Sequence, residues 1–461
     1  MPRSMRSSPG PPMATEPRRA TGGIGAAIAA AEAKARRSLL RNHGGGSATV
    51  SNLELFFDLI FVFAVTQLSH FLLADLTLLG GVKTALLFLA VWWAWMFTTW
   101  ATNWVDPDRA PNRLMLGAVM LASLVMSASV PAAFGATGMA FAVSYIAIQV
   151  GRSIYVSRVM EREGDGEGRN LLRVTIWFAA TAPLWIAGAL QANVLARSAL
   201  WLLALGIEYA GPFAFFRVPR LGRSRPEDWV ISGSHMAERC GLFIIIALGE
   251  GLVITGATYA AAKSQPGLDL SLLNAFVGSF AMWWLYFDMG ARRGQRHIEN
   301  HAVPGLIARQ AFTYWHIPIV AGIIVLAVAD ELVMSHPYDD VHGEFVAVVF
   351  GGTALFIGGL AGFKRISSGQ PWYPASHVYG MGLAVLLAAW GFFLQPPGLV
   401  LFTATTLLFI AIAVWEWGSF HGGWMEAMER RGWWLGKYLR QRTDKRRAAR
   451  LAREAAAREQ R

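Results

Sequence analysis

The chain has 461 residues, of which 54% are hydrophobic and only 15% charged, and its formal net charge is +11. A soluble domain of this length needs a more polar surface, so the composition excludes one and favours apolar surroundings. The positive charge does not point to nucleic acid, because it gathers in the two tails and in alternate loops. The single cysteine, Cys240, excludes an intramolecular disulfide.

Long apolar stretches recur along the whole chain. A helix needs about 20 mostly apolar residues to cross roughly 30 Å of hydrocarbon. The sequence therefore predicts an all-α, polytopic transmembrane bundle of about twelve spans. The spans are expected at about 53–74, 84–104, 114–134, 139–157, 174–191, 198–216, 236–258, 273–290, 307–329, 345–363, 378–395 and 399–417.

These spans divide into two halves between basic tails. Residues 1–46, rich in Arg, Ala, Gly and Pro, are expected to form a disordered cytoplasmic tail. Residues 47–218 form the first transmembrane half and residues 227–420 the second. Residues 421–461 set Trp and Tyr beside dense Arg and Lys, which predicts an amphipathic helix held at anionic lipid headgroups. An RNA-binding tail is the alternative.

The basic residues predict the orientation of the chain. When the N-terminus is placed in the cytoplasm, the loops and tails on that side carry most of the 41 Lys and Arg. The opposite loops carry only Lys83, Arg197 and Lys263. This distribution follows the positive-inside rule and predicts that both termini are cytoplasmic.

The two halves resemble each other weakly. In each, an acid opens the first helix (Glu54, Glu238) and a Trp–Trp pair lies in the second (including Trp93 and Trp284). Six spans per half would make two parallel repeats, an arrangement found in transporters. Shared apolar composition is the alternative explanation.

Acids and arginines lie near the predicted cytoplasmic ends of the spans. An ionisable side chain at the bilayer centre costs about 3 kcal/mol, so each one inside a span needs an explanation. Ser51 and Glu54 have the spacing of a capping box, so Glu54 is interpreted as a helix cap. Asp58 lies one turn deeper and needs a partner such as Arg239 or Arg309. A static ion pair and a gate or proton site both remain open for it. This inner tier comprises Glu54, Asp58, Glu238, Arg239, Asp288 and Arg309.

A second tier of polar residues lies near mid-span and comprises Glu208, Glu250 and His316. Glycines flank Glu250, which allows another helix or a ligand to approach closely. Two carboxylates and a histidine at similar depth predict an ion site or proton relay. A polar cluster that only holds helices together is the alternative. Histidine patterns in the loops match metal motifs only loosely, so neither a metal nor a cofactor is expected.

Four segments carry a specific resemblance: NLELFFDLIFVFAVTQLSH, ERCGLFIIIALGEGLV, WWLYFD and YWHIPIVAGIIVLAVADELV. They look like the signature segments of the low temperature requirement A (LtrA) family of bacterial polytopic membrane proteins. The resemblance runs from about 47 to 420 and implies a multi-pass protein of the bacterial inner membrane. It implies no catalytic or transport activity. The residues that fall in these segments are Glu54, Asp58, Glu238, Arg239, Glu250, Asp288 and His316.

A fainter similarity concerns ELFFDLIFVFAVT, which resembles the first-helix motif of FSD-motif potassium channels. Phe57 stands where that motif has Ser, and Leu242 stands where a second Asp would fall. Both departures count against a potassium pore.

The leading functional hypothesis is transport of a small solute or ion, coupled to protons through Glu250, Glu208 or His316. A cation channel using Asp58 is the second hypothesis. An intramembrane lipid-modifying enzyme and a non-transporting sensor or scaffold are further alternatives, and an enzyme is less expected than a non-enzyme. The expected partners are the lipid bilayer and a small solute, without nucleic acid, and a homo-oligomer stays open.

Overall fold

The computed structural model describes residues 38–41, 50–164, 168–225, 229, 231–262, 266–288, 304–420 and scattered residues between 428 and 452. Within these ranges the regular structure is helical, and strands are absent. Eleven of the described helices are long and apolar enough to cross a membrane. The prediction of an all-helical, multi-pass membrane protein is therefore confirmed.

The first half begins with α2 and ends with α8. Its bounds are α2 (Asn52–Leu73), α3 (Leu78–Trp104), α4 (Ala110–Ser129), η1 (Val130–Ala132), α5 (Gly138–Ile146), η2 (Ala147–Gly151), α6 (Arg152–Glu163), α7 (Gly168–Ala189) and α8 (Val194–Ala210). The π-helical turn η2 joins α5 and α6 into one continuous helix. With 17 residues, α8 is the predicted span that falls short of a candidate span in the structure.

The second half runs from α9 to α16. Its bounds are α9 (Gly233–Ala261), α10 (Leu268–Phe287), α12 (Pro304–Ala308), η4 (Arg309–Tyr314), α13 (His316–Ser335), α14 (Gly343–Ser368), α15 (Ala375–Leu394) and α16 (Gly398–Phe420). Here too a π-helical turn, η4, interrupts a long helix.

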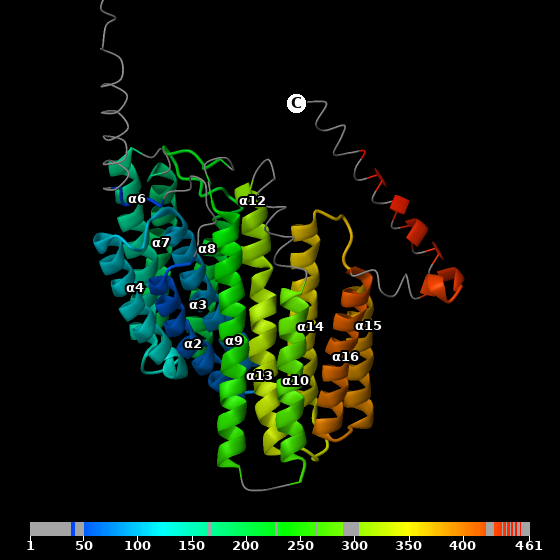
Figure 1. Ribbon diagram of the computed structural model, residues 1–461. Helices are drawn as coiled ribbons and strands as arrows, with labels where there is room; N and C mark the ends of the chain where they lie inside the picture. The colour runs from blue at the N-terminus through cyan, green and yellow to red at the C-terminus, as the bar shows by residue number, and fades with distance from the viewer. Residues whose placement is uncertain are drawn as a thin grey trace, which may run out of the picture.

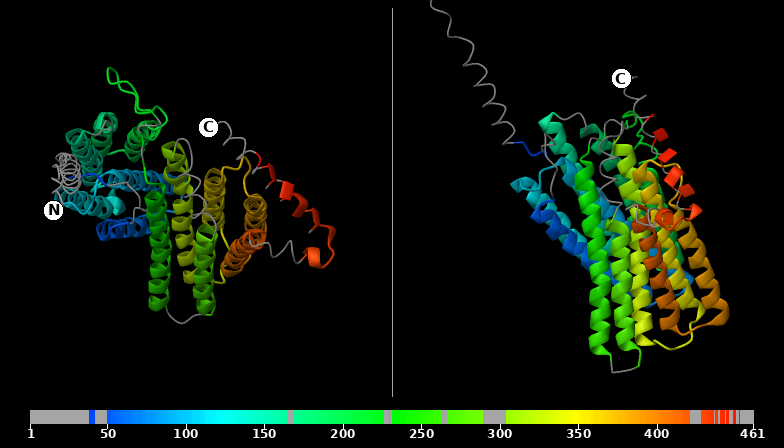
Figure 2. Two further views of the ribbon diagram at one scale, coloured as in Figure 1. Left: turned by 45° about the horizontal axis from the view of Figure 1, so that its top comes forward. Right: turned by 45° about the vertical axis from the view of Figure 1, so that its right-hand side comes forward.

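The two halves lie side by side. In Figure 1 the blue and cyan helices of the first half gather on one side, and the green to orange helices of the second half on the other. The two views of Figure 2 keep this separation. The helices α2 and α3 meet α9 and α13 between the halves. The core there is aromatic, with Trp92, Trp93 and Trp95 wholly buried.

Large apolar side chains also cover the outside of the bundle. Leu78, Leu114 and Phe393 are each more than three-quarters exposed. Water would not favour such a surface, whereas hydrocarbon does. The outer surface therefore agrees with burial in a bilayer.

A short segment of the predicted N-terminal tail packs on the bundle. The Arg41 backbone N–H donates to the Trp104 carbonyl (2.8 Å), and the Asp106 N–H donates to the Leu39 carbonyl (2.9 Å). The rest of the predicted tail lies outside the described residues, as does most of the predicted C-terminal helix at 421–461.

The residue pairs that suggested a duplication lie in different environments. Glu54 is wholly buried, whereas Glu238 is exposed. Trp93 is wholly buried, whereas Trp284 is 37% exposed. The two-repeat arrangement stays a prediction.

Candidate functional site

Three pairs of polar residues join α2 of the first half to α9 of the second. We call this contact the seam: Glu54 with His235, Asp58 with Arg239, and Thr66 with Glu250. The partners advance together along the two helices, so α2 and α9 run parallel. Figure 1 shows the two helices at the centre of the molecule. We call the end at which both begin the Asn52 end of the bundle.

The deepest ion pair of the seam joins Asp58 and Arg239. The Arg239 Nη2 donates to Asp58 Oδ1 at 2.7 Å, and both side chains are fully buried. The Trp95 indole N–H donates to the same oxygen at 2.8 Å. The other carboxylate oxygen, Oδ2, is buried without a hydrogen-bond partner. The structure therefore gives Asp58 a partner of the expected type, but satisfies only one of its oxygens.

Glu54 lies at the start of α2. The capping box with Ser51 is confirmed, with both reciprocal hydrogen bonds formed. Three further residues add contacts that the capping pattern did not predict: Arg41 at 3.0 Å, His235 Nε2 at 2.8 Å, and Arg239 Nη1 on the Glu54 carbonyl at 2.8 Å. Glu54 is therefore both a cap and a link between the halves.

The hydrogen bonds around His235 determine which ring nitrogen carries the proton. Asn103 Oδ1 accepts from the Ser232 N–H at 3.0 Å, which fixes the orientation of the amide. The Asn103 NH₂ group therefore faces His235 Nδ1 at 3.1 Å and donates to it. The Nε2 of His235 then carries the proton and donates it to Glu54.

Glu250 lies deeper in the bundle, and its carboxylate meets a hydroxyl group. Thr66 Oγ1 is in hydrogen-bond contact with Glu250 Oε1 and also lies 3.1 Å from the Val62 carbonyl. Lys, Arg and His side chains form no ion pair with Glu250 in the described part of the chain. A Cβ added at Gly251 would meet Ala327 Cβ at 3.3 Å, so α9 packs closely on α13 beside this acid.

Glu208 is buried within the first half. Three neutral donors from α5 and α7 surround its carboxylate: the Tyr145 hydroxyl, the Thr181 hydroxyl at 2.7 Å and the Trp185 indole at 2.9 Å. We call these four residues the Glu208 network. Hydrogen bonds to the charged form stabilise a buried carboxylate.

A buried arginine lies at the far end of the same hydrogen-bond chain. Arg152 donates to Gln149 Oε1 (2.6 Å), and Gln149 donates to the Tyr145 hydroxyl (3.0 Å), which donates to Glu208. The π-helical turn η2 carries Gln149. Two neutral side chains therefore bridge the arginine and the carboxylate, and every donor points toward the negative charge.

His316 is held within the second half. Its Nδ1 lies 2.8 Å from the Ala311 carbonyl, which can only accept, so Nδ1 carries the proton. Tyr286 donates its hydroxyl to Nε2 at 2.8 Å. In the described part of the chain no hydrogen bond or ion pair joins Glu208, Glu250 and His316 to one another.

The remaining residues of the predicted inner tier are scattered. Arg309 donates to the Pro212 carbonyl and does not contact Asp58. Glu238 accepts from the Val50 N–H at 3.3 Å at an exposed position. Asp288 follows α10, and its Oδ2 is buried without a partner.

A buried cluster in the second half was not predicted. Lys364 pairs with Glu416, and Ser376 and His377 lie 3.3 Å from the same carboxylate. Lys364 stands just beyond the predicted end of one span and Glu416 near the predicted end of another, where a charge does not by itself indicate burial. An opposite charge at each of two neighbouring helix ends was the signal that could have found the pair. Among the described residues, no group of three or more His, Cys, Asp and Glu is placed to hold a metal ion.

Comparison with known proteins supports the resemblance seen in the sequence. The model of a family described as bacterial low temperature requirement A protein (LtrA) matches residues 49–414, which include the whole seam. An uncharacterized protein of Rhizobium meliloti (strain 1021) is 36% identical over 378 residues, which cover 82% of this chain and 91% of the relative. No solved structure matches. The chain belongs to the bacterial low temperature requirement A protein family.

Proposed function

We propose that this protein moves a small solute or ion across the bacterial inner membrane, with the seam as the contact that changes and Glu250 as the residue that takes up and releases a proton. The observation that carries the proposal is the environment of Glu250. It is an acid, only 8% exposed, whose hydrogen-bond partner is the Thr66 hydroxyl. An acid kept inside a membrane bundle without a cation beside it marks a functional position.

The contacts of Thr66 support a proton at this point. A threonine hydroxyl carries one proton, yet Thr66 Oγ1 lies within hydrogen-bond distance of two acceptors, the Val62 carbonyl and Glu250. Both contacts are full hydrogen bonds only when Glu250 itself carries a proton and donates it to Thr66. When the proton leaves, Thr66 turns its own proton to the carboxylate.

The place of the seam between the halves supports a moving contact. Transporters built from repeats open their central site to one side of the membrane and then to the other by rocking one helix bundle against another. Glu250 lies eleven residues beyond Arg239, or about 16 Å along α9. The ion pairs at the Asn52 end would close that side, and their separation would open a path toward Glu250.

The register of the seam also supports a twelfth span and a cytoplasmic Asn52 end. Since α2 and α9 run parallel, an odd number of crossings is expected between them, which supports α8 as a fifth span alongside α3, α4, α5–α6 and α7. Its 17 residues extend about 25 Å. The basic loops then lie at the Asn52 end, which the positive-inside rule assigns to the cytoplasm together with both termini.

A cation channel through Asp58 receives less support. Its carboxylate is engaged by Arg239 and Trp95, so a permeating cation would have to displace a buried guanidinium. Transport with a proton step at Glu250 requires no such exchange.

The test is a flux assay in proteoliposomes that carry a pH-sensitive dye, with a panel of cations and small metabolites outside. Glu250→Gln keeps the size of the side chain and the contact with Thr66 but cannot exchange a proton. The matched control is Glu161→Gln, which changes an exposed carboxylate of α6. We expect solute-dependent proton movement in the native protein and the control, and its loss in Glu250→Gln. Unchanged proton movement in Glu250→Gln, or no flux from folded native protein, would overturn the proposal and favour a sensor or scaffold.

A further inference from the structure

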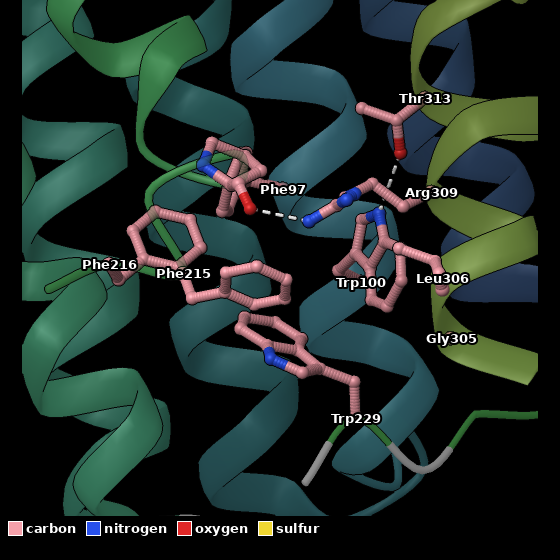
Figure 3. A pocket seen from close by; sticks show the side chains of 10 residues that line it. Phe97, Trp100, Phe215, Phe216, Trp229, Gly305, Leu306, Arg309 and Thr313 are labelled. Atoms are coloured by element: carbon pink, nitrogen blue, oxygen red, sulfur yellow. Dashed lines mark hydrogen bonds between the residues drawn. The ribbon is translucent and has the colours of Figure 1, made fainter. Parts of the chain in front are cut away.

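A pocket with aromatic walls opens between the two halves near the Asn52 end (Figure 3). The first half contributes α3 and the turn after α8, and the second half contributes α12 and η4. Its volume is about 40 Å³. The residues that line it are Phe97, Trp100, Pro212, Phe215, Phe216, Trp229, Gly305, Leu306, Arg309 and Thr313.

Arg309 supplies the only charge among these lining residues. Its guanidinium lies over the rings of Phe213 and Phe215, 5.5 and 5.4 Å from their centroids. It donates one hydrogen bond, to the Pro212 carbonyl, while its Nε is buried without a partner. No carboxylate pairs with Arg309 in the described part of the chain.

Two buried arginines of this protein have more hydrogen-bond partners than Arg309, although the Nε of each also lacks one. Arg197 donates to four backbone carbonyls, those of Ala133, Gly135, Ala189 and Gln191. Arg239 pairs with Asp58. The half-buried guanidinium of Arg309 has one carbonyl and two ring faces as partners, so most of its five donors are free to bind a ligand in the pocket.

We propose that this pocket binds a small organic anion, a carboxylate with a short apolar part. The planar guanidinium fits a carboxylate through two parallel hydrogen bonds. The aromatic walls favour carbon over water around the rest of the ligand. A cavity of this size has room for about three waters, because one water needs roughly 10–15 Å³ of it, so it admits a carboxylate and only a few carbons. Inorganic phosphate could pair with the same guanidinium, but it has no apolar part to place against these walls.

Binding at this pocket can be tested separately from the proposed transport, because a binding titration needs no membrane gradient. The assay is isothermal titration of the purified full-length protein in nanodiscs of phosphatidylcholine. Butyrate is the probe, butyramide is its neutral isostere, and inorganic phosphate is an anion without an apolar part. A second arm repeats the butyrate titration in nanodiscs that contain phosphatidylglycerol, to ask whether a lipid headgroup occupies the pocket instead.

Two variants and one control locate the binding. Arg309→Gln removes the charge but can still donate to Pro212, and Leu306→Trp fills the pocket while leaving Arg309 in place. The control is Arg365→Gln. Arg365 also donates to a proline carbonyl, that of Pro371, and lies over an aromatic ring, that of Tyr373, but it is not among the residues that line this pocket.

We expect butyrate to bind the native protein and the control at least tenfold more tightly than either pocket variant, and more tightly than butyramide or phosphate binds. Equal binding of butyrate by both pocket variants and the control would overturn the proposal, as would equal binding of butyramide. Loss of butyrate binding in phosphatidylglycerol nanodiscs would overturn it in favour of a lipid headgroup. If Arg309→Gln does not fold, Leu306→Trp alone decides between these outcomes.

Discussion

The seam and the Glu208 network bury carboxylates in opposite ways. Asp58 faces a cation that belongs to the other half, and one of its oxygens has no partner. Glu208 faces three neutral donors, all from its own half. Both regions exclude water, so the difference lies in which elements the hydrogen bonds join.

This difference separates contacts that brace a half from contacts that join the halves. Moving the halves apart would leave the Glu208 network intact, since α5, α7 and α8 move together. The same motion would break every pair of the seam. In the proposed transport cycle, a network within one half can therefore stay rigid, whereas the seam has to open.

The largest effect is expected from Arg239→Met, which removes the cation of the seam and leaves the Asp58 carboxylate buried and unpaired. Breaking a buried ion pair from one side costs about 3–5 kcal/mol. We expect a loss of that size in the free energy of unfolding, measured by denaturant titration of the protein in mixed micelles.

The double variant Asp58→Leu with Arg239→Met tests the origin of that loss. Replacing both charges by apolar side chains is often neutral for a buried pair. We expect the double variant to recover most of the stability but not the flux. If the double variant transports normally, the ion pair is not part of the closing contact.

A smaller effect is expected from Glu208→Gln. The amide oxygen can still accept from Trp185 and Thr181, but the NH₂ group cannot accept from Tyr145, which leaves the proton of a buried hydroxyl without an acceptor. Such a change costs about 1–3 kcal/mol. Because the Glu208 network lies within one half, we expect a loss in the free energy of unfolding with little change in flux per folded molecule. Abolished flux in a stable Glu208→Gln protein would give Glu208 the role assigned to Glu250.

Much of the fold could be predicted because a membrane span is a local signal. Apolar length alone located each of the eleven described helices that could cross a membrane, and the capping box at Ser51 and Glu54 was readable from four residues. The need of Asp58 for a cation also followed from its depth. The identity of that cation could not be predicted, because Arg239 and Arg309 differ only in where their helices pack.

Depth along a span did not predict which polar residues meet. The predicted spans give Glu208, Glu250 and His316 similar depths, yet each faces different neighbours because helix rotation and packing are set by long-range contacts. The π-helical turns η2 and η4 shift the faces of two helices and have no sequence signature that a periodicity count can detect. The pair of Lys364 and Glu416 was missed for a similar reason, since each residue alone looks like the end of a span.

The smallest expected effect is a difference in stability between variants of two helix caps, one in the seam and one within the first half. Ser51 caps α2 within the seam, where it also lies 3.0 Å from the Glu54 carboxylate, and Thr77 caps α3 within the first half, where it accepts from the Gly80 N–H at 3.1 Å. Removing a cap costs about 1 kcal/mol. Ser51→Ala also removes a hydroxyl contact of Glu54, whose carboxylate links to His235 across the seam.

We therefore expect Ser51→Ala to lose several tenths of a kcal/mol more than Thr77→Ala in the free energy of unfolding, because its cap and its link between the halves share one carboxylate. Both variants would be compared by the same denaturant titration. Equal losses would mean that Glu54 holds His235 without help from the cap. The capping box would then belong to α2 alone, and the seam would begin at Asp58.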